Sequence, residues 1–204
     1  MKGELKSKIL CIINRIGLKN RNFTIISNNC WGGFVYKKFN LKYNTPFIGL
    51  FIFASDYIKL LQNFKDIICD NIFFIDPKES KYYKKLNRID YPIGVIGDNI
   101  EIHFLHYKTR EEAKEKWERR VKRINFENLL IKFSDRDLCT ERDIEEFCML
   151  DYGKKLCFSA KEYPEFKEVI SFKEFYGLEC VENEWLYYER YINIKKILNE
   201  IKYK

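Results

Sequence analysis

Short apolar runs alternate with helix-like patterns along most of the chain. Runs rich in β-branched and aromatic residues predict strands at residues 23–27, 47–53, 72–75, 129–133 and 155–158. Apolar positions at helical spacing predict helices within residues 9–16, 32–39, 55–64, 80–86, 109–124, 140–147, 172–176 and 185–201. Strands that alternate with helices form parallel sheets through crossover connections, so this order predicts an α/β fold.

Turn and capping signals add detail to this pattern. Two apolar runs, residues 92–96 and 100–107, flank a Gly97-Asp98-Asn99 turn and predict a hairpin, which would make the sheet mixed. Thr109 with Glu112, and Thr140 with Asp143, have the spacing of helix capping boxes. We therefore predict a layered α/β domain with a mixed, largely parallel sheet.

Size and composition are consistent with one domain. The chain has 204 residues, 46% of them hydrophobic, and its 9 Gly and 4 Pro argue against long flexible linkers. We expect a single domain over residues 1–204, with an N-terminal helix at about residues 4–19 packed on it. Seven Cys at irregular spacing, without a CxxC pair, favour buried free thiols in a reducing compartment.

Charge and hydropathy restrict the partners and the location. The net charge is +7, but 37 basic residues are interleaved with 30 acidic ones and accompany no nucleic-acid-binding motif, so we predict no nucleic-acid partner. The longest apolar run, residues 47–54, is too short to cross a bilayer. We expect a cytoplasmic protein without a transmembrane segment, with room for peripheral association with a membrane complex.

Polar residues follow several predicted strands. They occur as Ser27-Asn28-Asn29, Ser134-Asp135-Arg136-Asp137 and Ser159-Ala160-Lys161. In parallel sheets ligands bind beyond the carboxyl ends of the strands, where these residues would meet. The alternative is that they only cap helices and turns, which Ser, Asp and Asn also favour.

Asp135 and Asp137 form an Asp-x-Asp pair after an apolar strand. Such oxygen ligands suit Mg²⁺ or Mn²⁺ bridging the phosphates of a nucleotide, which makes the pair a candidate metal site. The alternative is structural, with Asp137 capping a turn or pairing with Arg142.

Glu101 and His103 lie two residues apart on a predicted strand and therefore share a face. A carboxylate that orients an imidazole raises its basicity, which suits a general base. The alternative is a half-buried structural histidine. His106 would face the other side unless the strand has ended. Cys30, after the first strand, is either a buried thiol or a nucleophile at a helix start.

Four strings, residues 23–33, 100–107, 116–120 and 132–137, resemble a bacterial family, domain of unknown function 1919, often labelled exopolysaccharide biosynthesis protein. The resemblance extends from about Asn20 to Ile197. It implies a three-layer α/β/α architecture with a mixed sheet and a setting in capsule or exopolysaccharide assembly. It implies no mechanism or catalytic residues.

These observations lead to two functional hypotheses. The first is a sugar- or group-transferase that acts on a glycan precursor with a sugar nucleotide. In it, His103 oriented by Glu101 is the base, and Asp135 with Asp137 holds the cation or the donor. Its substrate-binding residues are Asn28, Asn29, Trp31, Arg136 and Lys161. The second hypothesis is a non-catalytic glycan-binding or assembly partner in the same pathway.

Overall fold

A computed structural model gives the fold and describes residues 10–86 and 89–201. Of the N-terminal helix expected at residues 4–19, residues 10–15 are helical and residues 4–9 lie outside the described residues. The strands are β1 (Thr24–Ser27), β2 (Phe73–Ile75), β3 (Ile93–Ile96), β4 (Ile100–His103), β5 (Leu129–Ser134), β6 (Lys155–Ser159) and β7 (Val169–Ser171). The α-helices are α2 (Trp31–Lys38), α3 (Ala54–Gln62), α4 (Phe64–Ile67), α5 (Arg110–Val121), α6 (Glu141–Met149) and α7 (Ile194–Glu200).

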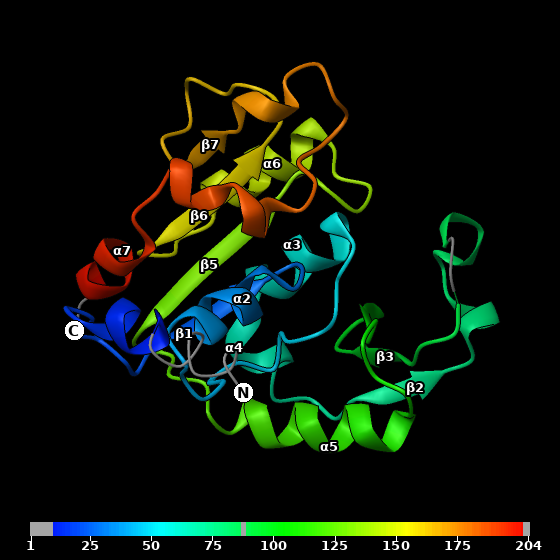
Figure 1. Ribbon diagram of the computed structural model, residues 1–204. Helices are drawn as coiled ribbons and strands as arrows, with labels where there is room; N and C mark the ends of the chain where they lie inside the picture. The colour runs from blue at the N-terminus through cyan, green and yellow to red at the C-terminus, as the bar shows by residue number, and fades with distance from the viewer. Residues whose placement is uncertain (1–9, 87–88, 202–204) are drawn as a thin grey trace.

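A parallel sheet of four strands forms the centre, in the order β1-β5-β6-β7 (Figure 1). Successive side chains of a strand point to opposite faces of the sheet, so each strand contributes apolar residues to two cores. Ile25 and Leu130 pack in one core, and Ile26 and Ile131 in the other. The predicted α/β fold with a largely parallel sheet is confirmed.

Helices cover both faces of this sheet. On one face, α2 and α7 contribute Trp31, Val35 and Leu198 to the core. On the other face, α3 and α6 contribute Leu60 and Phe147. A Cβ added to Gly32 would lie 3.0 Å from the Ile25 side chain, so this glycine lets α2 lie close against β1.

The antiparallel strands form a sheet of their own, in the order β2-β3-β4. The predicted hairpin is present as β3 and β4, with Gly97 and Asn99 at positive φ in its turn. The expectation of one mixed sheet is therefore corrected to one parallel and one antiparallel sheet.

The segment predicted as a strand at residues 47–53 is instead an irregular connection between the two sheets. Phe51 forms an isolated bridge with His103 of β4, and the Ile52 N–H donates to Asn28 O, just past β1, at 2.9 Å. The segment is apolar because it is buried on both sides, and periodicity alone does not distinguish such a run from a strand.

The C-terminal third has shorter elements than its pattern predicts. In place of one helix at residues 185–201, two 3-10 turns, Glu184–Leu186 and Tyr188–Arg190, precede α7. The three-residue strand β7 was not predicted. The helix predicted at residues 172–176 is only a 3-10 turn, Lys173–Phe175. Among the described residues, no helix combines the length and the apolar character needed to cross a bilayer.

Candidate functional site

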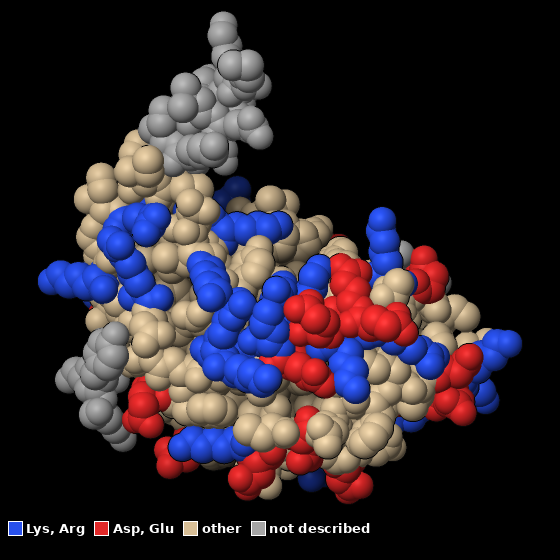
Figure 2. Space-filling view, turned by 90° about the horizontal axis from the view of Figure 1, so that it is seen from below, with Lys and Arg blue, Asp and Glu red and all other residues tan. Residues whose placement is uncertain are grey.

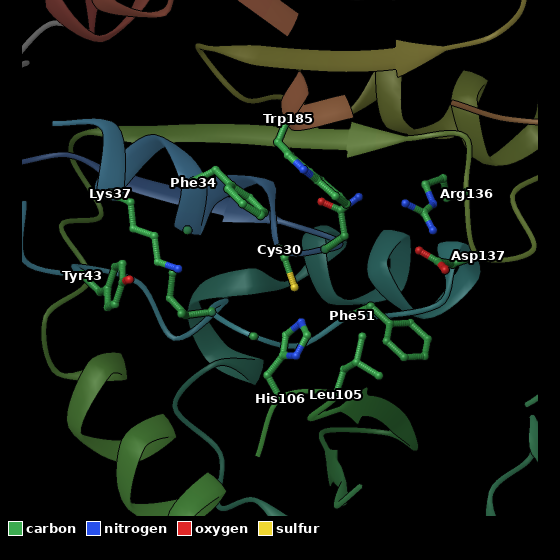
Figure 3. Close-up of a pocket in the computed structure, with 14 residues that line it drawn as sticks. Cys30, Phe34, Lys37, Tyr43, Phe51, Leu105, His106, Arg136, Asp137 and Trp185 are labelled. Carbon is green, nitrogen blue, oxygen red and sulfur yellow. The ribbon is translucent and has the colours of Figure 1, made fainter. Parts of the chain in front are cut away.

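A cleft of about 790 Å³ opens beyond the carboxyl ends of β1 and β5 (Figure 3). Its walls come from the turn after β1, helix α2, residues 43–51, the turn after β4, the loop after β5, and Trp185. Residues from five segments of the sequence, 29–37, 43–51, 105–106, 136–137 and 185, thus meet at the edge of the sheet where α/β proteins bind ligands.

Asn29 joins the ends of the two strands at the base of the cleft. Its Oδ1 accepts hydrogen bonds from the Trp31 N–H at 3.1 Å, Ser27 Oγ at 3.2 Å and Lys132 Nζ at 3.3 Å. Its Nδ2 donates to Ser134 Oγ at 3.1 Å, which leaves a second N–H on that nitrogen. Asn29 is therefore held rigidly, and it lines the cleft.

A buried ion pair lies behind Asn29. Lys132 of β5 donates to Glu184, and both side chains are fully buried. Burial lowers the pKa of Lys132, and the Glu184 carboxylate opposes this shift. The Lys132 ammonium also lies over the rings of Trp31 and Phe158, 5.9 and 5.1 Å from their centroids. The pair ties the 3-10 turn that carries Trp185 to the central strand.

Asp135 anchors a loop and does not line the cleft. Its Oδ2 accepts from the Ala160 N–H at 2.6 Å and Ser159 Oγ at 3.0 Å, and its Oδ1 accepts from the Val181 N–H at 2.8 Å. Burial raises the pKa of Asp135 against these three donors. Both oxygens thus fix the carboxyl end of β6 and the loop at residue 181.

Asp137 lies in the cleft wall with Arg136. Its backbone is left-handed, with φ of 57°, and its carbonyl accepts the first N–H of α3 from Ala54 at 3.0 Å. Burial raises the pKa of Asp137 to about 6, although Arg136 lowers it in part. This carboxyl group can therefore take up or release a proton near neutral pH.

Two aromatic rings form the opposite wall. Phe34 of α2 and Trp185 stack with centroids 4.8 Å apart and planes 8° from parallel. The Lys37 ammonium lies 5.8 Å from the centre of the Phe34 ring. Phe34 is exposed although it is apolar, and both rings border the cleft.

Cys30 and His106 point toward one another across the cleft in Figure 3. The Cys30 Sγ donates to Leu50 O at 3.6 Å, and burial raises the pKa of its thiol. Because β4 ends at His103, His106 lies in the turn after the strand and is exposed at the cleft. The raised pKa keeps the Cys30 thiol protonated at neutral pH, which weakens it as a nucleophile.

Glu101 and His103 share a face of β4, as the sequence predicts, but that face is buried away from the cleft lining. His103 stacks on Phe51 at 4.7 Å, and its Nε2 lies 3.4 Å from Glu101 Oε2. Burial acts to raise the pKa of Glu101, but the contact with His103 and hydrogen bonds from Ser80 and Lys81 lower it. This pair belongs to a buried network.

The other predicted site residues are distributed as follows. Asn28 is buried beside the cleft, where its Nδ2 donates to Ser134 O at 3.3 Å. Trp31 is fully buried between Phe158 and Tyr188 and offers no ring face to a ligand. Lys161 is exposed and paired with Glu141 at 3.0 Å. Of the predicted residues, Asn29, Arg136 and Asp137 line the cleft.

The proposed metal ligands, Asp135 and Asp137, have different surroundings. Asp135 bonds to backbone and hydroxyl donors, and Asp137 faces the cleft. Among residues 10–86 and 89–201, no three His, Cys, Asp or Glu side chains group as a metal site would require. Mg²⁺ or Mn²⁺ held by the pair stays a prediction from the sequence.

Sequence patterns missed Trp185, Phe34 and His106. Trp185 falls at the start of a predicted helix, where its ring has no evident direction. Phe34 lies in an apolar helix segment, and its exposure becomes evident only in the folded structure. His106 lies beyond the end of β4 at His103, so the alternation of faces along a strand does not apply to it.

The fold and the cleft define an α/β protein with a polar and aromatic cavity at the carboxyl edge of a parallel sheet. The sequence matches a protein family over residues 2–203, and the chain belongs to this family, described as Domain of unknown function (DUF1919). This confirms the resemblance noted in the sequence. An uncharacterized protein from Haemophilus influenzae (strain ATCC 51907 / DSM 11121 / KW20 / Rd) is 36% identical over 158 residues, which are 78% of this chain and 71% of the relative.

Proposed function

We propose that this protein is a sugar- or group-transferase that binds a sugar nucleotide or glycan precursor in the cleft. The observation that carries the proposal is the pairing of an aromatic wall, Phe34 and Trp185, with a polar wall of Asn29, Arg136 and Asp137. The link to capsule or exopolysaccharide assembly rests on the family resemblance of the sequence.

The two walls match the two kinds of surface on a sugar. The face of a pyranose ring carries C–H groups that pack on an aromatic ring, and its edge carries hydroxyl groups that need hydrogen-bond partners. Trp185 and Phe34 offer the aromatic surface. Asn29 and Arg136 offer N–H donors, and the Asp137 carboxylate accepts from hydroxyl groups.

Asp137 is the group that we assign to proton transfer. With a pKa of about 6, it is mostly ionised at pH 7 and can accept the proton of an attacking hydroxyl. The hydroxyl oxygen then bonds to the transferred group as the leaving group departs. We assign this role to Asp137 rather than to His103, because His103 lies behind Phe51 and does not line the cleft.

A cytoplasmic location fits a supply of sugar nucleotides, and a surface-polysaccharide setting fits peripheral association with a membrane assembly complex. Both stay part of the proposal. The two alternatives within it, transfer and non-catalytic glycan binding, require the same cleft and differ in whether a product forms.

Calorimetric titration with a panel of sugar nucleotides and short glycans tests the proposal, with product analysis in the same mixtures. Trp185→Ala should weaken binding of the active ligand about tenfold, as expected for loss of one aromatic stacking surface. Leu186→Ala is the matched control, because Leu186 is the exposed neighbour and does not line the cleft.

Transfer of the sugar or group by the wild-type protein, weakened only in the Trp185 variant, supports the transferase. Tight glycan binding without product supports the non-catalytic alternative. Equal effects of the Trp185 and Leu186 substitutions, or no binding by any member of the panel, contradict the proposed site.

A further inference from the structure

A second cavity of about 600 Å³ adjoins the cleft and shares Lys37 and Tyr43 with it. We call it the basic pocket, because five of the residues that line it are basic: Lys37, Lys42, Arg119, Arg120 and Arg123. No acidic residue of the described chain lines it. A ligand in the cleft can therefore extend into a neighbouring cavity with strongly positive walls.

Two of the arginines are fixed in place. Arg120 is 8% exposed, its Nη1 donates to Tyr107 Oη at 2.6 Å, and its guanidinium lies 5.3 Å from the centre of the Tyr43 ring. Arg123 Nη1 donates to Tyr43 O at 3.4 Å. Because these side chains are already ordered, an anion that binds them loses little conformational entropy.

The positive charge of the basic pocket is largely unneutralised. Within the described ranges, Lys37, Lys42 and Arg120 make no ion pair. Arg119 pairs with Glu115 at 3.3 Å, but both side chains are about half exposed, so solvent screens the pair. Figure 2 shows Lys and Arg side chains gathered on the face of the molecule that carries α5, beside a group of acidic side chains.

We infer that the basic pocket binds a diphosphate group. The inference rests on the proposed function, since the diphosphate would belong to the same ligand whose sugar lies in the cleft. Arginine forks match phosphate oxygens with paired hydrogen bonds, and several cations suit a group that carries more than one negative charge. Lys37 and Tyr43, which belong to both cavities, would lie where the sugar joins the diphosphate.

A double variant tests the basic pocket. Lys42→Gln with Arg119→Gln removes two exposed cations of the pocket and leaves the buried Arg120 in place. Lys114→Gln with Lys122→Gln is the matched control, because it removes the same charge from α5 and the residue after it, outside the pocket. Inorganic pyrophosphate is the first probe, titrated by calorimetry at fixed ionic strength.

We expect the Lys42/Arg119 variant to bind pyrophosphate about tenfold more weakly, and the control to change less than about twofold, because only the first loses direct contacts. Thermal unfolding verifies that both variants fold. Titration of uridine diphosphate and geranyl diphosphate then identifies the source, since the nucleotide or the lipid-like diphosphate should bind more tightly and be weakened in the same variant.

Equal losses in the two double variants, or sulfate competing as well as pyrophosphate, would overturn the diphosphate site and indicate general attraction of anions. Sugar-nucleotide binding that the Lys42/Arg119 change leaves intact would overturn this inference and leave the proposed function standing. Pyrophosphate binding in the basic pocket without sugar binding in the cleft would overturn the proposed function and leave the basic pocket standing as a diphosphate site.

Discussion

Two polar clusters, each built around buried charged side chains, differ in what they border. The cleft cluster, Asn29, Lys132 and Glu184, connects the ends of β1 and β5 to the turn that carries Trp185. The sheet cluster, Asp56, Lys81, Glu101 and His103, connects β4 to α3 and to the loop that holds Ser80. Only the cleft cluster contributes a residue to the cleft wall.

The comparison shows that a catalytic-looking pair of residues is not enough to mark a site. Glu101 and His103 have the composition of a general base with its orienting carboxylate, yet aromatic rings surround the imidazole on several sides. Lys132 and Glu184 are equally buried but hold the residues that face the cavity. The proximity of a cavity, which depends on the whole fold, distinguishes the two clusters.

The largest expected effect is on stability, from Lys132→Met. This change leaves Glu184 as a buried charge without its partner, which typically costs about 3–5 kcal/mol in the free energy of unfolding. The double variant with Glu184→Gln should recover most of that loss, because it removes the isolated charge. Urea unfolding measures both variants.

His103→Gln, from the sheet cluster, is the comparison for this change. It should cost about 1–2 kcal/mol through lost packing and hydrogen bonding and leave ligand affinity unchanged. A folded His103 variant that loses ligand binding or transfer, while the Lys132/Glu184 double variant keeps both, would contradict this assignment. It would place the functional site at the sheet cluster.

Asp137→Asn should have the next largest effect, a loss of activity whose size depends on pH. The raised pKa means that wild-type activity falls as the pH drops through about 6, where the carboxylate is protonated. The Asn variant should be about a hundredfold slower at pH 7.5, as expected for loss of a general base, and should lack this acidic limb. Rate profiles from pH 5 to 8 measure the difference.

The same variant should gain stability at neutral pH. A carboxyl group whose folded pKa lies above its unfolded value favours the folded state at low pH, and this contribution is lost as the pH rises through about 6. Asn tolerates the left-handed backbone at this position, so removing the charge should stabilise the protein by about 1–2 kcal/mol above pH 7. An unchanged or reduced stability would show that burial does not penalise the charged form of Asp137.

The sequence predicted the central sheet well because its strands have clear local signals. The apolar runs that became β1, β5 and β6 are buried on both faces, and the capping box at Thr140 and Asp143 marks the start of α6. It failed at residues 47–53, where burial between two sheets imitates a strand, and at β7, which is too short for a pattern.

The site was only partly predictable, for a related reason. Strand ends located Asn29, Arg136 and Asp137, because parallel strands bring their carboxyl ends together. Side-chain direction at a turn depends on tertiary packing, so the sequence did not separate the buried Trp31 from Trp185 at the cleft, or His103 from His106.

The central claim is that the ligand occupies the cleft beside the cleft cluster, and Cys30 reports on it directly. Alkylation by iodoacetamide, followed by mass spectrometry of the peptides, compares Cys30 in the cleft wall with the exposed Cys69. Cys30 should react more slowly than Cys69 at pH 7.5, because burial raises its pKa. A saturating ligand that calorimetry shows to be bound should slow Cys30 at least about fivefold further and leave Cys69 unchanged. Equal Cys30 rates with and without that bound ligand would contradict the claim.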